Sequence, residues 1–279
     1  MLNNNNSGDT SAMKYKILSA LYVIISAWFF YLHLFLNFNL DGTQYDLKIW
    51  ASSYQIIALL GGMFGLYVSR KWGGYRSIVG KAVLFFALGL LLQVFGQSFD
   101  SYLNVLKNVE IPYPSLGDIG FFGSVVSYIV GAYYMLKSVG FKFSFKSLKG
   151  KLIAIIIPLI ILISSYLFFL RGYEFDWSSP LRVFLDFGYP FGEAIYLSIA
   201  ILAFLVSLNY LGGIMRKPIL LFIFALFIQY ACEFTFLSQA SAGTWYAGGV
   251  NDFMYFTSYF IMALSLVKLG STFYKIKNS

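Results

Sequence analysis

Eight apolar runs, each long enough to cross a lipid bilayer, constrain this chain more than any other feature of its sequence. A bilayer core about 30 Å thick is crossed by a helix of about 20 apolar residues. Transmembrane strands would alternate apolar and polar residues over about ten positions, and none of the runs does so. The predicted spans are Ile17–Leu36, Ala51–Ser69, Ala82–Phe99, Ile119–Leu136, Leu152–Leu170, Phe187–Leu208, Pro218–Leu237 and Phe253–Val267. We therefore expect an all-α, polytopic membrane protein with eight transmembrane helices.

Composition supports this fold class and excludes several kinds of chemistry. The chain is 59% apolar and 11% charged, whereas soluble domains are about 45–50% apolar and about 25% charged. Its one cysteine, Cys232, excludes a disulfide framework or a cysteine metal cluster within one chain. Its one histidine, His33, excludes a bis-histidine haem and a three-histidine zinc site. We expect no metal, no cofactor and no catalytic residue.

The distribution of charge along the chain predicts the orientation. Of the 20 Lys and Arg residues, all except Lys48, Lys107, Arg171 and Arg182 fall in segments at one face of the membrane. Basic loops stay in the cytoplasm, so both termini are predicted to be cytoplasmic. The net charge of +8 is then a topology signal with a contribution from anionic lipid headgroups, and we expect no binding to nucleic acid.

The predicted organisation is a single membrane domain with short ends. We expect a disordered N-terminal tail over residues 1–14, an eight-helix domain over residues 15–270 and a cytoplasmic tail over residues 271–279. Within the domain, four tandem hairpins are predicted at about residues 15–76, 77–140, 150–211 and 216–270.

A short motif repeats in these hairpins, at the outer start of each even-numbered helix. An Asp is followed six positions later by Ser or Gly, and the four Asp residues are 72, 68 and 66 residues apart. They are Asp46, Asp118, Asp186 and Asp252. Two odd-numbered helices also match, because Gln93-x-x-x-Gln97 resembles Gln229-x-x-x-Glu233. Because every hairpin starts inside, the repeat is parallel, with any pseudo-symmetry axis along the membrane normal.

The four Asp residues have two interpretations. A carboxylate at a helix start accepts bonds from free N–H groups and favours the positive end of the helix dipole. Thr43-x-x-Asp46 and Ser115-x-x-Asp118 have the form of capping boxes, so structural capping is the first interpretation. Contact with a ligand is the second.

Glu193 and Glu233 are harder to explain as purely structural residues, because a carboxylate within the hydrocarbon is costly unless it is protonated, paired or hydrated. The alternative is a protonated Glu that only joins helices. His33 and Gln97 lie at a similar depth, and each is also explained by packing or by interhelical hydrogen bonds. If the hairpins close around one centre, these four side chains face an outward-opening cup beneath the ring of Asp residues. Such an acidic, aromatic cup suits a cationic or polar ligand, or protons.

Three motifs resemble a known family. They are Pro114-Ser115-x-x-Asp118, Leu185-Asp186-x-x-Tyr189-Pro190-x-Gly192-Glu193 and the block centred on Asp252. Over about residues 80–270 the chain resembles the multi-helix membrane module, with P-S-x-x-D and L-D-x-x-Y-P-x-G-D motifs, that precedes some prokaryotic sensor histidine kinases and diguanylate cyclases. The resemblance implies a prokaryotic inner or plasma membrane. It marks as site residues Asp118, Asp186, Tyr189, Pro190, Glu193 and Asp252, with Glu193 where the family usually has Asp.

These observations predict a ligand-binding membrane sensor and not an enzyme. About ten residues follow the last predicted helix and carry no kinase, cyclase or PAS domain, so we expect the module to stand alone and signal through a membrane or cytoplasmic partner, or as a homo-oligomer. The predicted ligand-binding residues are His33, Gln97, Asp118, Asp186, Tyr189, Glu193, Glu233 and Asp252. The alternative is a small proton- or cation-coupled transporter or channel. A lipid-modifying enzyme and a structural subunit are weaker alternatives.

Overall fold

The computed structural model describes residues 4–38, 43–139, 156, 158–164, 166–167, 173, 175–210 and 216–278. Within these residues the chain is helical and contains no strand. The α-helices are α1 (Asn4–Phe38), α2 (Gln44–Ser53), α3 (Gln55–Lys71), α4 (Ile78–Ser101), α5 (Gly117–Ser138), α7 (Pro180–Tyr210), α8 (Arg216–Ala242) and α9 (Val250–Asn278). Short 3-10 and π turns lie at Gly74–Arg76 and Tyr102–Leu106.

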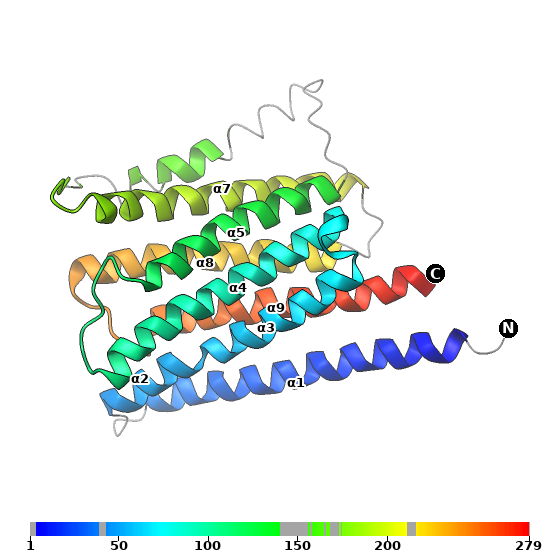
Figure 1. Cartoon of the computed structure of the whole chain (residues 1–279), viewed down its shortest axis with the longest axis horizontal. Helices are drawn as coiled ribbons and strands as arrows, with labels where there is room; N and C mark the ends of the chain where they lie inside the picture. Colours follow the sequence, from blue (N-terminus) through cyan, green and yellow to red (C-terminus); the bar gives the residue numbers. More distant parts are fainter. Residues whose placement is uncertain are drawn as a thin grey trace.

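Seven helical segments among the described residues are long and apolar enough to cross a membrane, which indicates a multi-pass membrane protein. They correspond to seven of the eight predicted spans, with α2 and α3 forming one segment. The other predicted span, Leu152–Leu170, lies mostly outside the described residues. The start of α1 and the end of α9 lie at the same end of the bundle (Figure 1).

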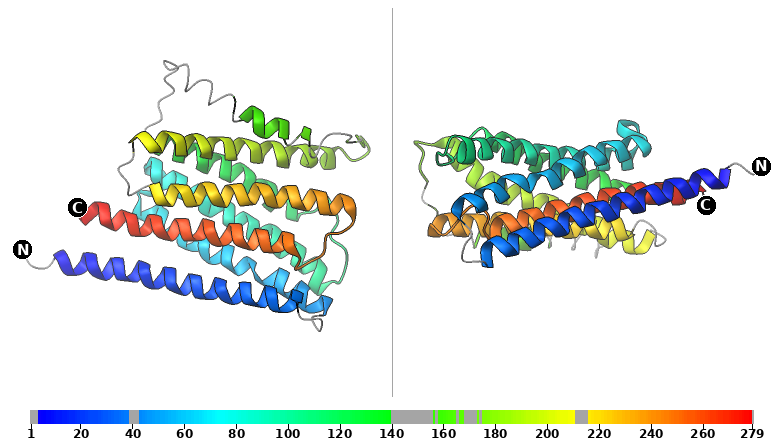
Figure 2. Two further views of the ribbon diagram at one scale, coloured as in Figure 1. Left: turned by 180° about the vertical axis from the view of Figure 1, so that it is seen from behind. Right: turned by 90° about the horizontal axis from the view of Figure 1, so that it is seen from below.

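Six of these helices form a closed ring. Each helix packs against the next in the order α3, α4, α5, α7, α8 and α9, and α9 packs back against α3. Helix α1 lies outside the ring, at the edge of the bundle beside α9 (Figure 2). Many of the large apolar side chains of α1 are exposed, as expected for a helix that faces lipid.

The ring consists of two halves with the same packing pattern. The first half contains α3, α4 and α5, the second contains α7, α8 and α9, and the joins between halves are α5–α7 and α9–α3. The side-chain bonds repeat as well. The Gln93 amide donates to the Ser124 hydroxyl over 2.7 Å, and the Ser258 hydroxyl donates to the Gln229 amide oxygen over 2.9 Å. The predicted likeness of these two Gln-containing helices is therefore visible in their bonds.

Packed aromatic side chains fill the centre of this ring of helices, below its outer end. The rings of Phe86 and Phe222, one from each half, stack with centroids 4.5 Å apart. Tyr54, Tyr128 and Tyr196 are almost fully buried around them. This core occupies the middle of the bundle, and a large cavity lies toward the outer end of the helices.

Two expectations about the ends of helices are wrong. Residues 4–14 were expected to be a disordered tail but continue α1 from Asn4, because extending a formed helix costs little and no proline precedes Pro112. Asp186 and Pro190 were expected where the chain enters a helix. They lie inside α7, which begins at Pro180, and Pro180 supplies the helix start instead.

Candidate functional site

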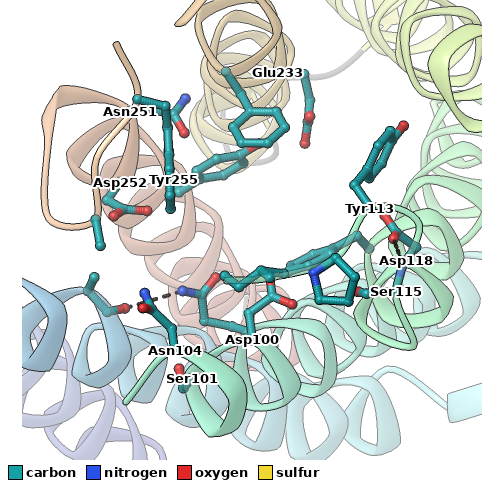
Figure 3. Close-up of a pocket in the computed structure, with 18 of the residues that line it drawn as sticks. Asp100, Ser101, Asn104, Tyr113, Ser115, Asp118, Glu233, Asn251, Asp252 and Tyr255 are labelled. Carbon is teal, nitrogen blue, oxygen red and sulfur yellow. Dashed lines mark hydrogen bonds between the residues drawn. The ribbon is translucent and has the colours of Figure 1, made fainter. Parts of the chain in front are cut away.

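A cavity of about 380 Å³ lies at the end of the ring opposite both termini. Its wall comes from the last turns of α4 and α8, the first turns of α5 and α9, α7 and the connections between them (Figure 3). Pockets for small molecules typically measure about 300–1,000 Å³. The cavity is therefore large enough for a small organic ligand.

Five carboxyl groups line this cavity, and no basic side chain in the described part of the chain lines it with them. Among the described residues of its wall there is no Lys, Arg or His. The acidic residues of the wall come from five helices of the ring and are Asp100, Asp118, Asp186, Glu233 and Asp252. Four of these five belong to the predicted site.

Asp118 joins the two halves of the ring at α5–α7. Its Oδ2 accepts a 2.7 Å bond from the backbone N–H of Ser115, and its Oδ1 accepts a 2.8 Å bond from the Tyr189 hydroxyl. The first bond is part of the predicted capping arrangement, and the Ser115 hydroxyl also accepts from the Gly117 N–H over 3.0 Å. Asp118 thus caps α5 and also faces the cavity, so the two sequence interpretations do not exclude each other.

Asp252 makes the equivalent join at α9–α3. Its Oδ2 accepts a 2.6 Å bond from the backbone N–H of Gly248, and its Oδ1 accepts a 3.3 Å bond from the Tyr54 hydroxyl. Gly248 has φ +80°, and a Cβ there would lie 2.8 Å from the carbonyl oxygen of Leu47, so glycine fits this turn. By contrast, Asp46 forms the predicted capping box with Thr43 and does not line the cavity.

Asp186 is the best satisfied acid of the wall. Its two oxygens accept bonds from the hydroxyls of Tyr113, over 2.8 Å, and Tyr173, over 2.6 Å. Arg182 lies 3.9 Å from the same carboxylate, one helical turn away. Loss of solvent and the bond to Asp186 raise the pKa of Tyr173 to about 12. The same causes raise the pKa of Tyr113, so both tyrosines remain donors at neutral pH.

Asp100 is an acidic wall residue that the sequence interpretation missed. Its Oδ1 is buried and has no hydrogen-bond partner in the protein. It lies over the start of α5, where a Cβ at Gly117 would be only 2.7 Å away. The signal was present, because Gln93, Gln97 and Asp100 are spaced i, i+4 and i+7 and so share one face of an apolar helix.

Asn251 is a second wall residue with an unsatisfied acceptor. Its side chain is 1% exposed and donates to the Cys232 carbonyl over 2.7 Å, but its Oδ1 has no partner in the protein. Two further buried wall atoms without partners are the Ser101 hydroxyl and the Trp245 indole nitrogen. Buried polar atoms are normally paired, so these wall atoms have unused hydrogen-bonding capacity.

Glu233 and Gln97 occupy the wall as predicted. Glu233 lies near the end of α8 with the phenol of Tyr255 beside it (Figure 3). The Gln97 amide donates to the Ala51 carbonyl over 3.2 Å, which ties α4 to α2 at the cavity edge. Tyr189 completes the set of predicted residues that the fold brings together.

His33 and Glu193 are not among the residues that line the cavity. The His33 ring packs between Trp50 and Phe253, with centroid distances of 4.7 and 4.6 Å, which matches the packing interpretation. Glu193 is buried behind the wall and bonds to Tyr196.

The wall combines acids with aromatic rings. No three His, Cys, Asp or Glu side chains among the described residues are grouped closely enough to hold one. Seven aromatic side chains contribute to the wall, namely Tyr113, Phe121, Tyr189, Phe236, Trp245, Tyr255 and Tyr259. Acids and aromatic faces together attract organic cations, through charge and through cation–π contacts.

Comparison of the chain with models of known protein families, with curated proteins and with solved structures finds no match.

Proposed function

We propose that this protein is a membrane receptor module that binds a small organic cation in the acidic cavity. The observation that carries the proposal is a wall with five carboxyl groups and, among its described residues, no basic side chain. Burying several like charges together is unfavourable unless a cation compensates them. A bound ammonium group would supply that charge.

The unsatisfied atoms of the wall indicate what the ligand offers. Asp100 Oδ1 and Asn251 Oδ1 accept hydrogen bonds and have no donor in the protein. An alkylammonium group carries N–H donors for such acceptors, and its methylene groups fit the apolar part of the wall. A divalent metal ion fits less well, because the described acids are not grouped around one point.

The packed floor favours a receptor over an open channel. Tyr259 lines the cavity and donates to the Gln93 side chain over 2.8 Å, and the stacked pair Phe86–Phe222 belongs to the aromatic core of the same bundle. A polar path through this core would require the rings to separate. A cavity open to one side and closed below suits a sensor that reports occupancy by a change in helix packing.

The orientation and the partner follow from the charge pattern. We place the cavity outside the cell and both termini in the cytoplasm, where basic residues such as Arg70, Lys81 and Lys268 lie at the opposite end of the bundle. The resemblance to prokaryotic sensor modules is consistent with a plasma-membrane receptor that passes its signal to a partner at this basic end. A small cation-coupled transporter is the second candidate, because Pro190 lies inside α7 and lets that helix bend next to the cavity.

A binding experiment tests the proposal directly. The purified protein in detergent is titrated with tetramethylammonium and butylammonium while its melting temperature and the heat of binding are recorded. A ligand that binds only the folded protein raises the melting temperature as its concentration increases. We expect both cations to raise the melting temperature of the wild type and neither to raise that of the Asp100→Asn/Asp252→Asn variant. Glu110 is an exposed acid outside the cavity, so the Glu110→Gln control should respond like the wild type. An equal rise in melting temperature with neopentyl alcohol, an uncharged molecule of similar shape, would contradict a cation site. Cation flux into proteoliposomes would favour the transporter.

A further inference from the structure

A buried acid lies behind the cavity wall and takes no part in the cation site described above. Glu193 on α7 is 1% exposed. Its Oε1 accepts a 3.0 Å hydrogen bond from the Tyr196 hydroxyl, and its Oε2 has no partner in the protein. A single hydrogen bond from a neutral hydroxyl compensates only weakly for burying a charged carboxylate.

The groups around Glu193 supply no positive charge. The titratable side chains that act on it or feel its charge, from its own helix and from α5, α8 and α9, are Tyr196, Tyr128, Cys232, Glu233 and Tyr255. None of these described neighbours is basic, and Glu233 is a second acid. An ionised Glu193 would therefore stand without a counter-ion in a dry, aromatic environment, which strongly favours its protonated form.

Glu233 connects this buried acid with the cavity. It lines the wall of the cavity and is close enough to Glu193 for the two carboxyl groups to interact electrostatically. A positive charge in the cavity lowers the cost of negative charge on both groups. The hydroxyl of Tyr128 is buried, has no partner in the protein and interacts electrostatically with Glu193. It is therefore a candidate second donor to the ionised form of Glu193.

We propose that Glu193 holds a proton in the empty protein and releases it, through Glu233, when an organic cation occupies the cavity. The inference rests on the cation-binding function proposed above. One cation enters and one proton leaves from a carboxyl group to water, so the protein with its bound cation has the same net charge as the empty protein. Binding of the cation is thereby coupled to pH, and the same exchange would couple cation and proton movement if the protein were a transporter.

Calorimetric titration with tetramethylammonium tests this coupling, because this cation has no proton of its own to lose. Titrations in two buffers with different ionisation enthalpies give the number of protons released per cation bound. We expect the wild-type protein to release nearly one proton and its affinity to rise with pH by up to about tenfold per unit. Glu193→Gln should bind without release and with an affinity independent of pH, and Glu110→Gln should behave like the wild type.

A second measurement keeps the test decisive if Glu193→Gln does not fold. The infrared difference spectrum of the wild-type protein with and without tetramethylammonium should show loss of a protonated-carboxyl band. Tyr128→Phe, which removes the second donor and leaves the acid in place, should reduce this loss. Binding of the cation without proton release, or release unchanged in Glu193→Gln, overturns the coupling and leaves the cation site standing. No binding of tetramethylammonium or butylammonium overturns the proposed function and the coupling that rests on it.

Discussion

The two halves of the ring share a frame and differ in where they place charge. At the join α5–α7, Asp118 accepts bonds from Tyr189 and from a backbone N–H before its helix, and Asp252 does the same with Tyr54 at the join α9–α3. If Gln93 is matched with Gln229, then Gln97 corresponds to Glu233.

The same register pairs Asp100 with Phe236, so α4 and α8 each contribute one acid that the other lacks. The frame is thus repeated, while the cavity is asymmetric. A symmetric frame holds the helices in register, and the unmatched acids give a ligand a preferred orientation in the cavity. The substitutions below test where the two halves are equivalent and where they differ.

The largest effect, a loss of thermal stability, is expected from substitution of Gly120, a glycine of the first half that the second half replaces with Met254. A Cβ at Gly120 would lie 2.5 Å from the Leu92 carbonyl oxygen and 2.6 Å from the Gly96 nitrogen, so Gly120→Ala must push α4 and α5 apart. Overpacking of this kind costs about 1–3 kcal/mol or more. We expect a clearly lower melting temperature in detergent.

Two controls make this measurement specific. At Gly123 on the same helix, a Cβ would meet only the Leu92 side chain at 3.5 Å, an ordinary contact, so Gly123→Ala should melt close to the wild type. Met254 stands at the position that corresponds to Gly120 in the second half, and Met254→Ala should also be mild. Equal losses at Gly120 and Gly123 would show that the backbone contact of α4 with α5 is not what sets stability.

The next effect concerns the acid that distinguishes α8 from α4. Glu233→Gln should weaken the affinity for tetramethylammonium about tenfold or more, because removing one charge that faces a bound cation costs at least about 1.4 kcal/mol. Adding Gln97→Glu places a carboxylate at the corresponding position of the other half, on the same cavity wall.

We expect this double variant to regain part of the affinity when it is titrated by calorimetry at one pH. Gln97→Glu alone should strengthen binding. If the double variant binds no better than Glu233→Gln, the two positions are not equivalent for a ligand.

The membrane-spanning helices were predictable from the sequence, because the length of an apolar run is a local property that is read directly. The repeated Asp motif marked the first turn of a helix at Asp46, Asp118 and Asp252, and it was wrong at Asp186, which lies inside α7. The cavity wall was harder to predict. Asp100 was missed because it follows the predicted span that ends at Phe99 and has no counterpart in the repeat, and its role depends on how closely α5 approaches at Gly117.

Glu193 and His33 were predicted to belong to the site, but neither is among the residues that line the cavity. Their depth along the helices suggested that they face a common centre, but depth says nothing about rotation around the helix axis. Packing decides rotation, and it places His33 between Trp50 and Phe253 and turns Glu193 toward Tyr196. Only the three-dimensional arrangement of neighbouring helices separates wall residues from those behind the wall.

A smaller effect is expected from the two joins between the halves. Tyr54→Phe and Tyr189→Phe each remove the hydroxyl that bonds an Asp of the wall, which leaves that carboxylate with fewer donors. Loss of one such bond typically costs about 1–3 kcal/mol. Thermal unfolding of both variants should show losses that differ little from each other. A loss at one join alone would contradict the structural equivalence of the halves.

The smallest effect on stability is expected at the Asp186 site and should disappear at alkaline pH. The pKa of Tyr173 is raised from its usual 10.0 to about 12, so its neutral hydroxyl stabilises the folded protein fully below pH 10. That contribution is lost as the pH rises from 10 to 12, because the unfolded chain then gives up the tyrosine proton that the folded protein still holds for the bond to Asp186. Tyr173→Phe should therefore be slightly less stable than the wild type at pH 8 and lose less of its stability between pH 10 and pH 12. Melting temperatures measured over this range check the sign, and Tyr45→Phe is the matched exposed control. A parallel decline of the wild type and Tyr173→Phe would show that the bond to Asp186 contributes nothing to the stability of this join.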